Sequence, residues 1–286
     1  MSQKDSLQKF IFTDCNVRGQ LLRMNKSIGV ILAQRDYPEI LRKFLSELLA
    51  ASAMLSASIK FDGKVTLQIQ GDGPVSLMLA QCDNRQRLRG LAKWQDLPDS
   101  QQSLQELFGA ADLLISIATN KKVSNYQAVV KLTGTSISDA IEEYFNTSEQ
   151  LPTKIIFASP FMQHSEPGIQ NDLVGIFLQV IPTETNYEKE SWLSIINELE
   201  QGLERTDLQK ENNLVVLHNI FPEHELRAFD EQPIAFYCQC SVERSKNTLK
   251  TMPKSEVDSL LAKHKIITVT CDFCNKKYEF DAEDLK

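Results

Sequence analysis

Residues 236–244 read Phe-Tyr-Cys-Gln-Cys-Ser-Val-Glu-Arg, and residues 269–278 read Val-Thr-Cys-Asp-Phe-Cys-Asn-Lys-Lys-Tyr. Four of the chain's six cysteines lie here as a CxC pair and a CxxC pair with 30 residues between them: Cys238, Cys240, Cys271 and Cys274. Structural zinc takes four cysteine or histidine ligands in a tetrahedron, and two short motifs from distant segments can supply all four. The spacing therefore predicts a four-cysteine site that holds one Zn²⁺ per chain.

The same spacings also suit local disulfides. One residue separates the cysteines of the first pair, and CxxC is the spacing of thiol–disulfide exchange motifs. Zinc-bound sulfur is a thiolate, which is the form that peroxide-type oxidants attack. A permanently closed structural zinc site is the alternative. We favour a redox switch, because both pairs can close locally and a weakly self-supported acidic segment lies directly upstream.

Length and composition indicate a soluble globular protein. The 286 residues suffice for one large or two ordinary domains. The sequence has neither an apolar run of about 18 residues nor a basic N-terminal region followed by an apolar stretch. We therefore expect a cytoplasmic protein without membrane contact, in a compartment where reduced thiols favour metal ligation over permanent disulfides.

The formal net charge of -7 is concentrated in one segment. Residues 1–182 carry 18 Lys+Arg against 18 Asp+Glu, residues 183–233 carry 4 against 12, and residues 234–286 carry 9 against 8. The middle segment thus holds a net charge of -8. No segment is basic enough for nucleic-acid binding, which normally needs clustered Lys and Arg.

Hydrophobic patterning predicts an α+β fold, with a mixed domain of antiparallel sheets around a buried helix over residues 1–182. Apolar residues at Phe10, Phe12 and Val17–Met24 flank an Asp-Cys-Asn turn and predict a hairpin. Pro38 suits a first helical turn, and apolar residues follow at helical spacing to Leu55. Alternating segments then predict a meander over 65–94, and further strands at 113–117, 126–132, 155–158 and 174–180.

Residues 183–233 predict an acidic, helical, metastable linker. Its apolar side chains fall on helical stripes or short runs, and we take them as candidate client-binding residues: Trp192, Ile196, Leu199, Leu203, Leu214 and Leu217. The segment has apolar faces but little core of its own, so its order must come from a neighbouring domain.

Residues 234–286 predict a small zinc-binding redox-switch domain. A helix is expected over 253–264, and strands at 266–270 and 278–280 flank the CxxC pair. A domain of this size is only marginally stable unless a metal site or disulfides stabilise it. Structural zinc contributes roughly 10–16 kcal/mol in small metal-dependent folds, so metal loss should unfold it.

The chain resembles the heat-shock protein 33 family, also called the 33-kDa chaperonin family, over essentially its whole length. The resemblance rests on both cysteine motifs, on Gln70-Gly-Asp-Gly-Pro74 and on Arg89-Gly90. It implies an ATP-independent holdase rather than an enzyme, inactive when reduced and zinc-bound. Oxidation would form the disulfides Cys238–Cys240 and Cys271–Cys274 and release zinc. The partners implied are unfolded or oxidatively damaged client proteins, with a possible homodimer in the oxidised state.

The residues fit that account. Loss of the metal site would melt the small domain, free the linker and expose apolar surface that binds unfolded proteins. The acidic linker would help to keep the loaded complex soluble. No Walker-type GxxxxGK[ST] motif is present.

Two other classes remain as alternatives. A thiol–disulfide oxidoreductase would use the CxxC pair directly, and would need it at an electropositive helix N-terminus. A zinc-ribbon protein that binds nucleic acid is disfavoured by the nearly neutral C-terminal segment.

Several further residues are assigned no functional role. The isolated thiols of Cys15 and Cys82 are interpreted as small apolar fillers. The four histidines are not spaced as a metal cluster: His164, His218, His224 and His264. An alternating basic stripe is interpreted as the solvated face of a strand: Arg85, Arg87, Arg89 and Lys93.

Overall fold

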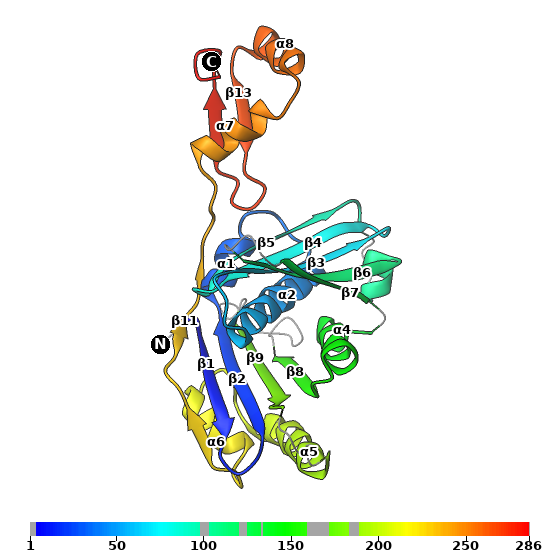
Figure 1. Cartoon of the computed structure of the whole chain (residues 1–286), viewed down its shortest axis with the longest axis vertical. Helices are drawn as coiled ribbons and strands as arrows, with labels where there is room; N and C mark the ends of the chain where they lie inside the picture. Colours follow the sequence, from blue (N-terminus) through cyan, green and yellow to red (C-terminus); the bar gives the residue numbers. More distant parts are fainter. Residues whose placement is uncertain are drawn as a thin grey trace. The chain divides into compact units, whose positions relative to one another are not determined.

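The computed structural model describes residues 4–97, 103–119, 125–132, 134–158, 172–182 and 189–285. The chain forms two compact units, Met1–Phe236 and Tyr237–Lys286. Both units combine helices with largely antiparallel sheets (Figure 1), which confirms the predicted α+β class.

The first sheet of unit 1 has the strand order β10-β1-β2-β9-β8, and β11 also pairs with β1. Its strands are β1 (Ser6–Phe12), β2 (Val17–Met24), β8 (Thr153–Ala158), β9 (Leu173–Val180), β10 (Leu226–Ala228) and β11 (Gln232–Pro233). All of these pairs are antiparallel. The predicted opening hairpin is confirmed, because β1 and β2 pair from Ser6 opposite Arg23 to Ile11 opposite Arg18.

The second sheet has the order β12-β5-β4-β3-β6-β7. Its strands are β3 (Gly63–Gly71), β4 (Val75–Asp83), β5 (Arg87–Trp94), β6 (Ala111–Thr119), β7 (Asn125–Lys131) and β12 (Ala235–Phe236). The predicted meander is confirmed in β3–β5. Its first turn needs glycine, since a Cβ on Gly73 would lie 2.6 Å from the backbone of Gly109. The short strand β12 is parallel to β5 and was not predicted.

A buried helix, α2 (Glu39–Ser58), lies between the two sheets and packs against strands of both (Figure 1). It follows Pro38 as predicted, and its apolar side chains join both sheets in one core. The sequence analysis missed α1 (Lys26–Leu32) and α3 (Leu104–Phe108). Helix α4 (Ile137–Tyr144) continues into a π-helical turn, η1 (Phe145–Glu149).

Two helices of the predicted linker cover the other face of the first sheet. These are α5 (Lys189–Arg205) and α6 (Asn213–Ile220), seen beside β1 and β2 in Figure 1. A second core joins them to the sheet, with buried Phe10, Phe12 and Leu21 on the sheet side. The described linker residues, 189–233, therefore lie within unit 1. That residues 183–233 act as a separate, metastable linker stays a prediction.

Unit 2 is small. It contains α7 (Val242–Lys250), α8 (Lys254–His264) and the antiparallel strands β13 (Ile267–Thr270) and β14 (Lys277–Phe280). The predicted helix and hairpin are confirmed, whereas α7 was missed. Over residues 237–285 the buried core consists of five side chains: Leu249, Val257, Ile267, Tyr278 and Phe280.

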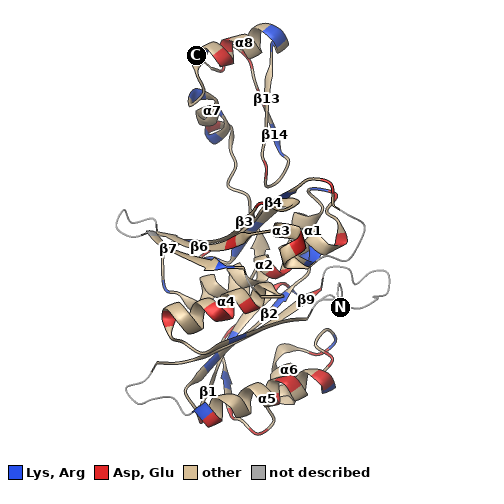
Figure 2. Ribbon diagram, turned by 90° about the vertical axis from the view of Figure 1, so that its right-hand side faces the viewer, with Lys and Arg blue, Asp and Glu red and all other residues tan. Residues whose placement is uncertain are grey.

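Figure 2 marks the positions of basic and acidic residues along the ribbon, including those on α4, α5 and α8. Within the described ranges, no helix combines the length and the apolar character that a membrane crossing requires.

Candidate metal centre

The four predicted ligands converge within unit 2. Cys238 and Cys240 precede α7, and Cys271 and Cys274 lie in the turn that joins β13 to β14. Their four sulfur atoms lie within 4.8 Å of one another. The two closest approaches join one motif to the other, at 3.6 Å between Cys238 and Cys271 and 3.4 Å between Cys240 and Cys274.

This donor set fits zinc. Tetrahedral zinc with Zn–S bonds of about 2.3 Å sets its sulfurs about 3.8 Å apart, close to the separations observed here. A disulfide would hold two sulfurs about 2.05 Å apart, and all six cysteines of the chain are free thiols. All four cysteines of the cluster are half-buried. The arrangement can therefore bind a metal ion and also remains open to small oxidants.

Local structure positions both cysteine segments. Ser241 caps α7 by accepting a hydrogen bond from the backbone N–H of Arg244, directly after the CxC pair. The Arg244 guanidinium donates to the carbonyl oxygen of Gln239, over 2.9 Å, and so holds the loop between the two cysteines. In the CxxC turn, the backbone N–H groups of Cys271 and Asn275 donate to the carbonyl oxygens of Lys276 and Cys271.

Tyr278 is a neighbour of the metal centre that the sequence analysis missed. Its hydroxyl donates a hydrogen bond to Cys240 Sγ over 3.1 Å, and its ring belongs to the small core of unit 2. A group that hydrogen-bonds to a metal ligand orients that ligand and tunes its affinity for the metal. The signal in the sequence was a tyrosine four residues after Cys274, on the strand that leaves the turn.

The sulfurs differ in their tendency to ionise. Burial acts to raise the pKa of Cys240, but hydrogen bonds from Tyr278 and the other thiols outweigh it and lower the pKa to about 7. Burial is the largest influence that raises the pKa values of Cys238 and Cys274. Donation to Cys240 raises the pKa of Tyr278 to about 12. Cys240 is thus the first of these three thiols to become a thiolate.

Comparison with known proteins identifies the family. The family model described as Hsp33 protein matches residues 5–281. The 33 kDa chaperonin of Shewanella loihica is 37% identical over 284 residues, covering 99% of this chain and 95% of the relative. The chain belongs to the Hsp33 family. A second Hsp33 relative, from Proteus mirabilis, is 35% identical over 288 residues, covering 100% of this chain and 96% of its own.

A solved Hsp33 structure shares the fold. The crystal structure of the Thermotoga maritima 33 kDa chaperonin superimposes with a TM-score of 0.80 at 21% identity, covering 98% of this chain and 96% of that one. Hsp33 is a chaperone family, so the chain is assigned to the chaperones.

The apolar side chains predicted to bind clients are unequally exposed in this Hsp33 chain. Leu199 and Leu217 are buried in the core that joins the helices to the first sheet. Trp192, Ile196 and Leu203 are partly buried against that core, whereas 59% of Leu214 is exposed. Their role in binding clients stays a prediction.

The CxxC pair does not have the environment that an oxidoreductase requires. Cys271 and Cys274 lie between two strands, and neither begins a helix. An activated CxxC thiol normally sits at a helix N-terminus, whose partial positive charge stabilises the thiolate. The position of the pair therefore favours metal binding.

A second group of metal-ligand side chains occurs in unit 1. Donor atoms of Asp14, Cys15 and His224 lie within 4.8 Å of one another. His224 Nδ1 lies 2.7 Å from Asp14 Oδ2, and its Nε2 lies 3.3 Å from Glu198 Oε1. The sequence analysis missed this group because Asp14 and His224 are 210 positions apart.

The other residues to which no role was assigned lie apart from the cysteine cluster. Cys82 is fully buried in β4, His218 lies on α6 and His264 ends α8. His164 falls outside the described residues. In the basic stripe, Arg87 pairs with Asp83 and Arg89 donates to Gln81.

Proposed function

We propose that this Hsp33 chain is a redox-regulated holdase that needs no ATP, inactive while its four cysteines are reduced and active after they are oxidised. The observation that carries the proposal is the convergence of four half-buried thiols in a unit whose own core is very small. The site would hold one zinc ion per chain through Cys238, Cys240, Cys271 and Cys274. Bound zinc would keep the sulfurs as thiolates and tie the two motifs together.

Oxidation would convert the thiols to two disulfides. Each disulfide forms when two thiols lose two protons and two electrons, which reduce one molecule of hydrogen peroxide to two molecules of water. From the family resemblance we propose the pairs Cys238–Cys240 and Cys271–Cys274. The shortest sulfur–sulfur distances instead join the two motifs. The pairing therefore needs a direct test by mass spectrometry of peptides.

The oxidised sulfurs would no longer bind zinc, and unit 2 would lose its main source of stability. A structural zinc site contributes roughly 10–16 kcal/mol. A core in a domain this small supplies about 3–5 kcal/mol at most. Five buried side chains cannot replace the metal, so we expect unit 2 to unfold.

Unfolding would extend into the linker and uncover apolar surface. Helices α5 and α6 cover the first sheet through Leu199 and Leu217, opposite Phe10 and Phe12. When these helices detach, both the helix stripes and the sheet face meet water and can bind unfolded chains. The linker's net charge of -8 would keep such complexes soluble.

The remaining expectations follow from the same scheme. A cytoplasmic location would supply the reducing conditions that keep the thiols available. The family resemblance implies that the oxidised form dimerises. We expect clients to be unfolding proteins, with no role for nucleic acid or membrane.

The decisive experiment follows zinc content, secondary structure and chaperone activity together. The reduced, zinc-loaded protein is treated with peroxide at mildly raised temperature, while a chromogenic chelator reports zinc and circular dichroism reports folding. Suppression of client aggregation should appear as one zinc per chain is released. A Cys15→Ser variant serves as control, because its thiol lies outside the cysteine cluster. Equal suppression by the reduced, zinc-loaded protein would contradict the proposal.

A further inference from the structure

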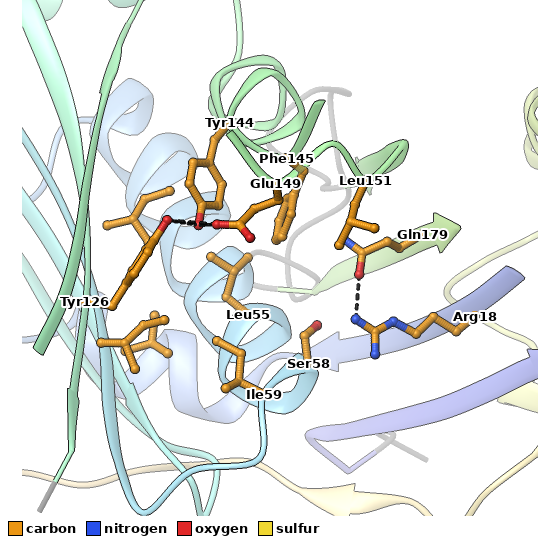
Figure 3. A pocket seen from close by; sticks show the side chains of 13 residues that line it. Arg18, Leu55, Ser58, Ile59, Tyr126, Tyr144, Phe145, Glu149, Leu151 and Gln179 are labelled. Carbon is orange, nitrogen blue, oxygen red and sulfur yellow. Dashed lines mark hydrogen bonds between the residues drawn. The ribbon is translucent and has the colours of Figure 1, made fainter. Parts of the chain in front are cut away.

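Unit 1 contains a cavity of about 350 Å³ that the chaperone mechanism does not use (Figure 3). It lies where the end of α2 meets β2, β3, β6, β7, β9, α4 and η1. Its volume is at the small end of the range for ligand pockets, about 300–1,000 Å³. Most of its wall is hydrocarbon, from side chains such as Leu55, Ile59, Ile117 and Leu151. The cavity is therefore suited to a small, largely apolar molecule.

At one end of the cavity, the polar side chains already form hydrogen bonds with one another. Tyr126 and Tyr144 both donate hydrogen bonds to Glu149 Oε1, over 2.8 and 2.5 Å, and their hydroxyls lie 2.8 Å apart. Figure 3 shows this group on the side of the cavity away from Arg18. The Glu149 carboxylate has two phenol donors, and its negative charge disfavours a second anion there.

The other polar end carries an undercompensated positive charge. Arg18 is half-buried, and its Nη2 donates to Gln179 Oε1 over 2.6 Å, a neutral acceptor. Its Nε is buried and has no hydrogen-bond partner among the described residues. Among the residues that the structure describes, no carboxylate forms an ion pair with Arg18. Burial lowers the pKa of Arg18, as expected for a guanidinium partly removed from water.

Two further cations, Lys9 and Lys60, lie near Arg18 but do not line the cavity. Burial lowers the pKa of Lys9, and the positive charges of Arg18 and Lys60 lower it further. The Lys9 ammonium donates to the carbonyl oxygen of Ala57, in the last turn of α2 and two positions from Ile59. The cavity thus has the Arg18 guanidinium at one end, hydrocarbon in the middle and the Glu149 carboxylate at the far end.

We propose that this cavity binds an apolar monocarboxylate of the medium-chain fatty-acid type. The carboxylate would lie against the Arg18 guanidinium, which matches a planar two-oxygen anion better than any other side chain. The alkyl chain would cover Leu55 and Ile59 and end short of Glu149. The charge of Glu149 selects against a ligand with a carboxylate at both ends.

The test uses the reduced, zinc-loaded full-length protein and three ligands of equal chain length. Decanoate, decan-1-ol and decanedioate are titrated below their aggregation concentrations by isothermal calorimetry. We expect decanoate to bind once per chain, and the alcohol and the dicarboxylate to bind at least about tenfold more weakly. The alcohol has no carboxylate to interact with Arg18, and the second carboxylate of decanedioate would be repelled by Glu149. Equal binding of decanoate and decan-1-ol would overturn the proposal, as would binding of many decanoate molecules per chain.

Variants assign the binding to this cavity. Arg18→Gln should weaken decanoate at least about tenfold and leave decan-1-ol unchanged, whereas the exposed Arg85→Gln should change neither. A second pair of variants is placed on Ile59, which is 38% exposed, so that the test does not depend on the folding of Arg18→Gln. Ile59→Glu should repel decanoate and Ile59→Lys should retain it. Unchanged decanoate affinity in Arg18→Gln, or equal affinity in both Ile59 variants, would contradict the site.

Discussion

Arg23 Nε donates a hydrogen bond to Asn213 Oδ1 over 2.6 Å, and so joins the middle of the first sheet to the start of α6. The same guanidinium donates to the carbonyl oxygens of Leu208 and Glu211, and only 6% of Arg23 is exposed. One buried side chain therefore holds three positions of the predicted linker on unit 1. In the proposed mechanism, we expect this contact to oppose detachment of the linker.

Arg23→Met should loosen the linker without touching the cysteines. The substitution keeps an unbranched side chain but leaves one buried and two partly buried acceptors without their donor. A hydrogen bond to a charged group contributes roughly 1.5–3 kcal/mol, so the free energy of unfolding should fall by at least that amount. The reduced variant should bind an apolar dye and suppress client aggregation in part. Arg85→Met, at an exposed position, is the matched control; an unchanged urea midpoint in Arg23→Met would refute the role of the clamp.

Leu199 and Leu193 on α5 are the same residue type but differ in burial, so their substitutions test the contribution of burial. Leu199 is fully buried against the sheet, whereas 54% of Leu193 is exposed. Leu199→Ala should cost about 2–5 kcal/mol and let α5 detach at lower temperature. Leu193→Ala should leave the reduced protein unchanged within about 0.5 kcal/mol. Limited proteolysis between residues 189 and 220 reports the difference, and similar cleavage rates in the two variants would count against a packed linker.

Tyr278→Phe tests the hydroxyl that contacts Cys240 Sγ. The ring remains in the core of unit 2, so folding should be retained while the hydrogen bond is lost. Removal of a hydrogen-bond partner of a metal ligand typically weakens metal binding about 10- to 100-fold. Competition with a chelator of known zinc affinity measures the change. A zinc affinity equal to that of the parent protein would show that the hydroxyl does not support the site.

Glu47 should make the stability of unit 1 depend on pH. It lies in α2 with 2% exposure, and burial raises its pKa to about 7, against an opposing effect of Lys43. The unfolded chain has the lower pKa, so this contribution to stability is fully present below about pH 4.5 and is lost as the pH rises through 7. Glu47→Gln should therefore be the more stable protein at pH 8, by up to about 3 kcal/mol.

The comparison is made from urea midpoints of Glu47→Gln and the parent between pH 5 and 8. The difference should shrink as the pH falls, and Glu223→Gln, at an exposed position, serves as the control for loss of a surface carboxylate. A constant advantage of Glu47→Gln at all pH values would show that Glu47 is not protonated in the folded state near neutrality.

The sequence analysis was most successful where the information is local. The helix after Pro38 and the β3–β4 hairpin of the meander depend on residues close together in the chain, and each occurs as predicted. Residue periodicity also predicted the helix α5. The predicted apolar stripe included Ile196, but Ile195 is the buried residue and Ile196 is only partly buried. Helix α7 was missed because its sequence is very polar, with Val242 and Leu249 as its only large apolar residues.

Contacts between distant segments were decided by the tertiary structure. The pairing of β12 with β5, the clamp from Arg23 to Asn213 and the donation from Tyr278 to Cys240 each join residues far apart in the chain. Such a contact cannot be predicted from the hydrophobic periodicity of either segment, because it depends on how sheets and helices pack. The same holds for the cavity beside Arg18, whose wall comes from several separate elements. Ligand types follow from the order of residues, whereas the neighbours of a buried charge follow only from the completed fold.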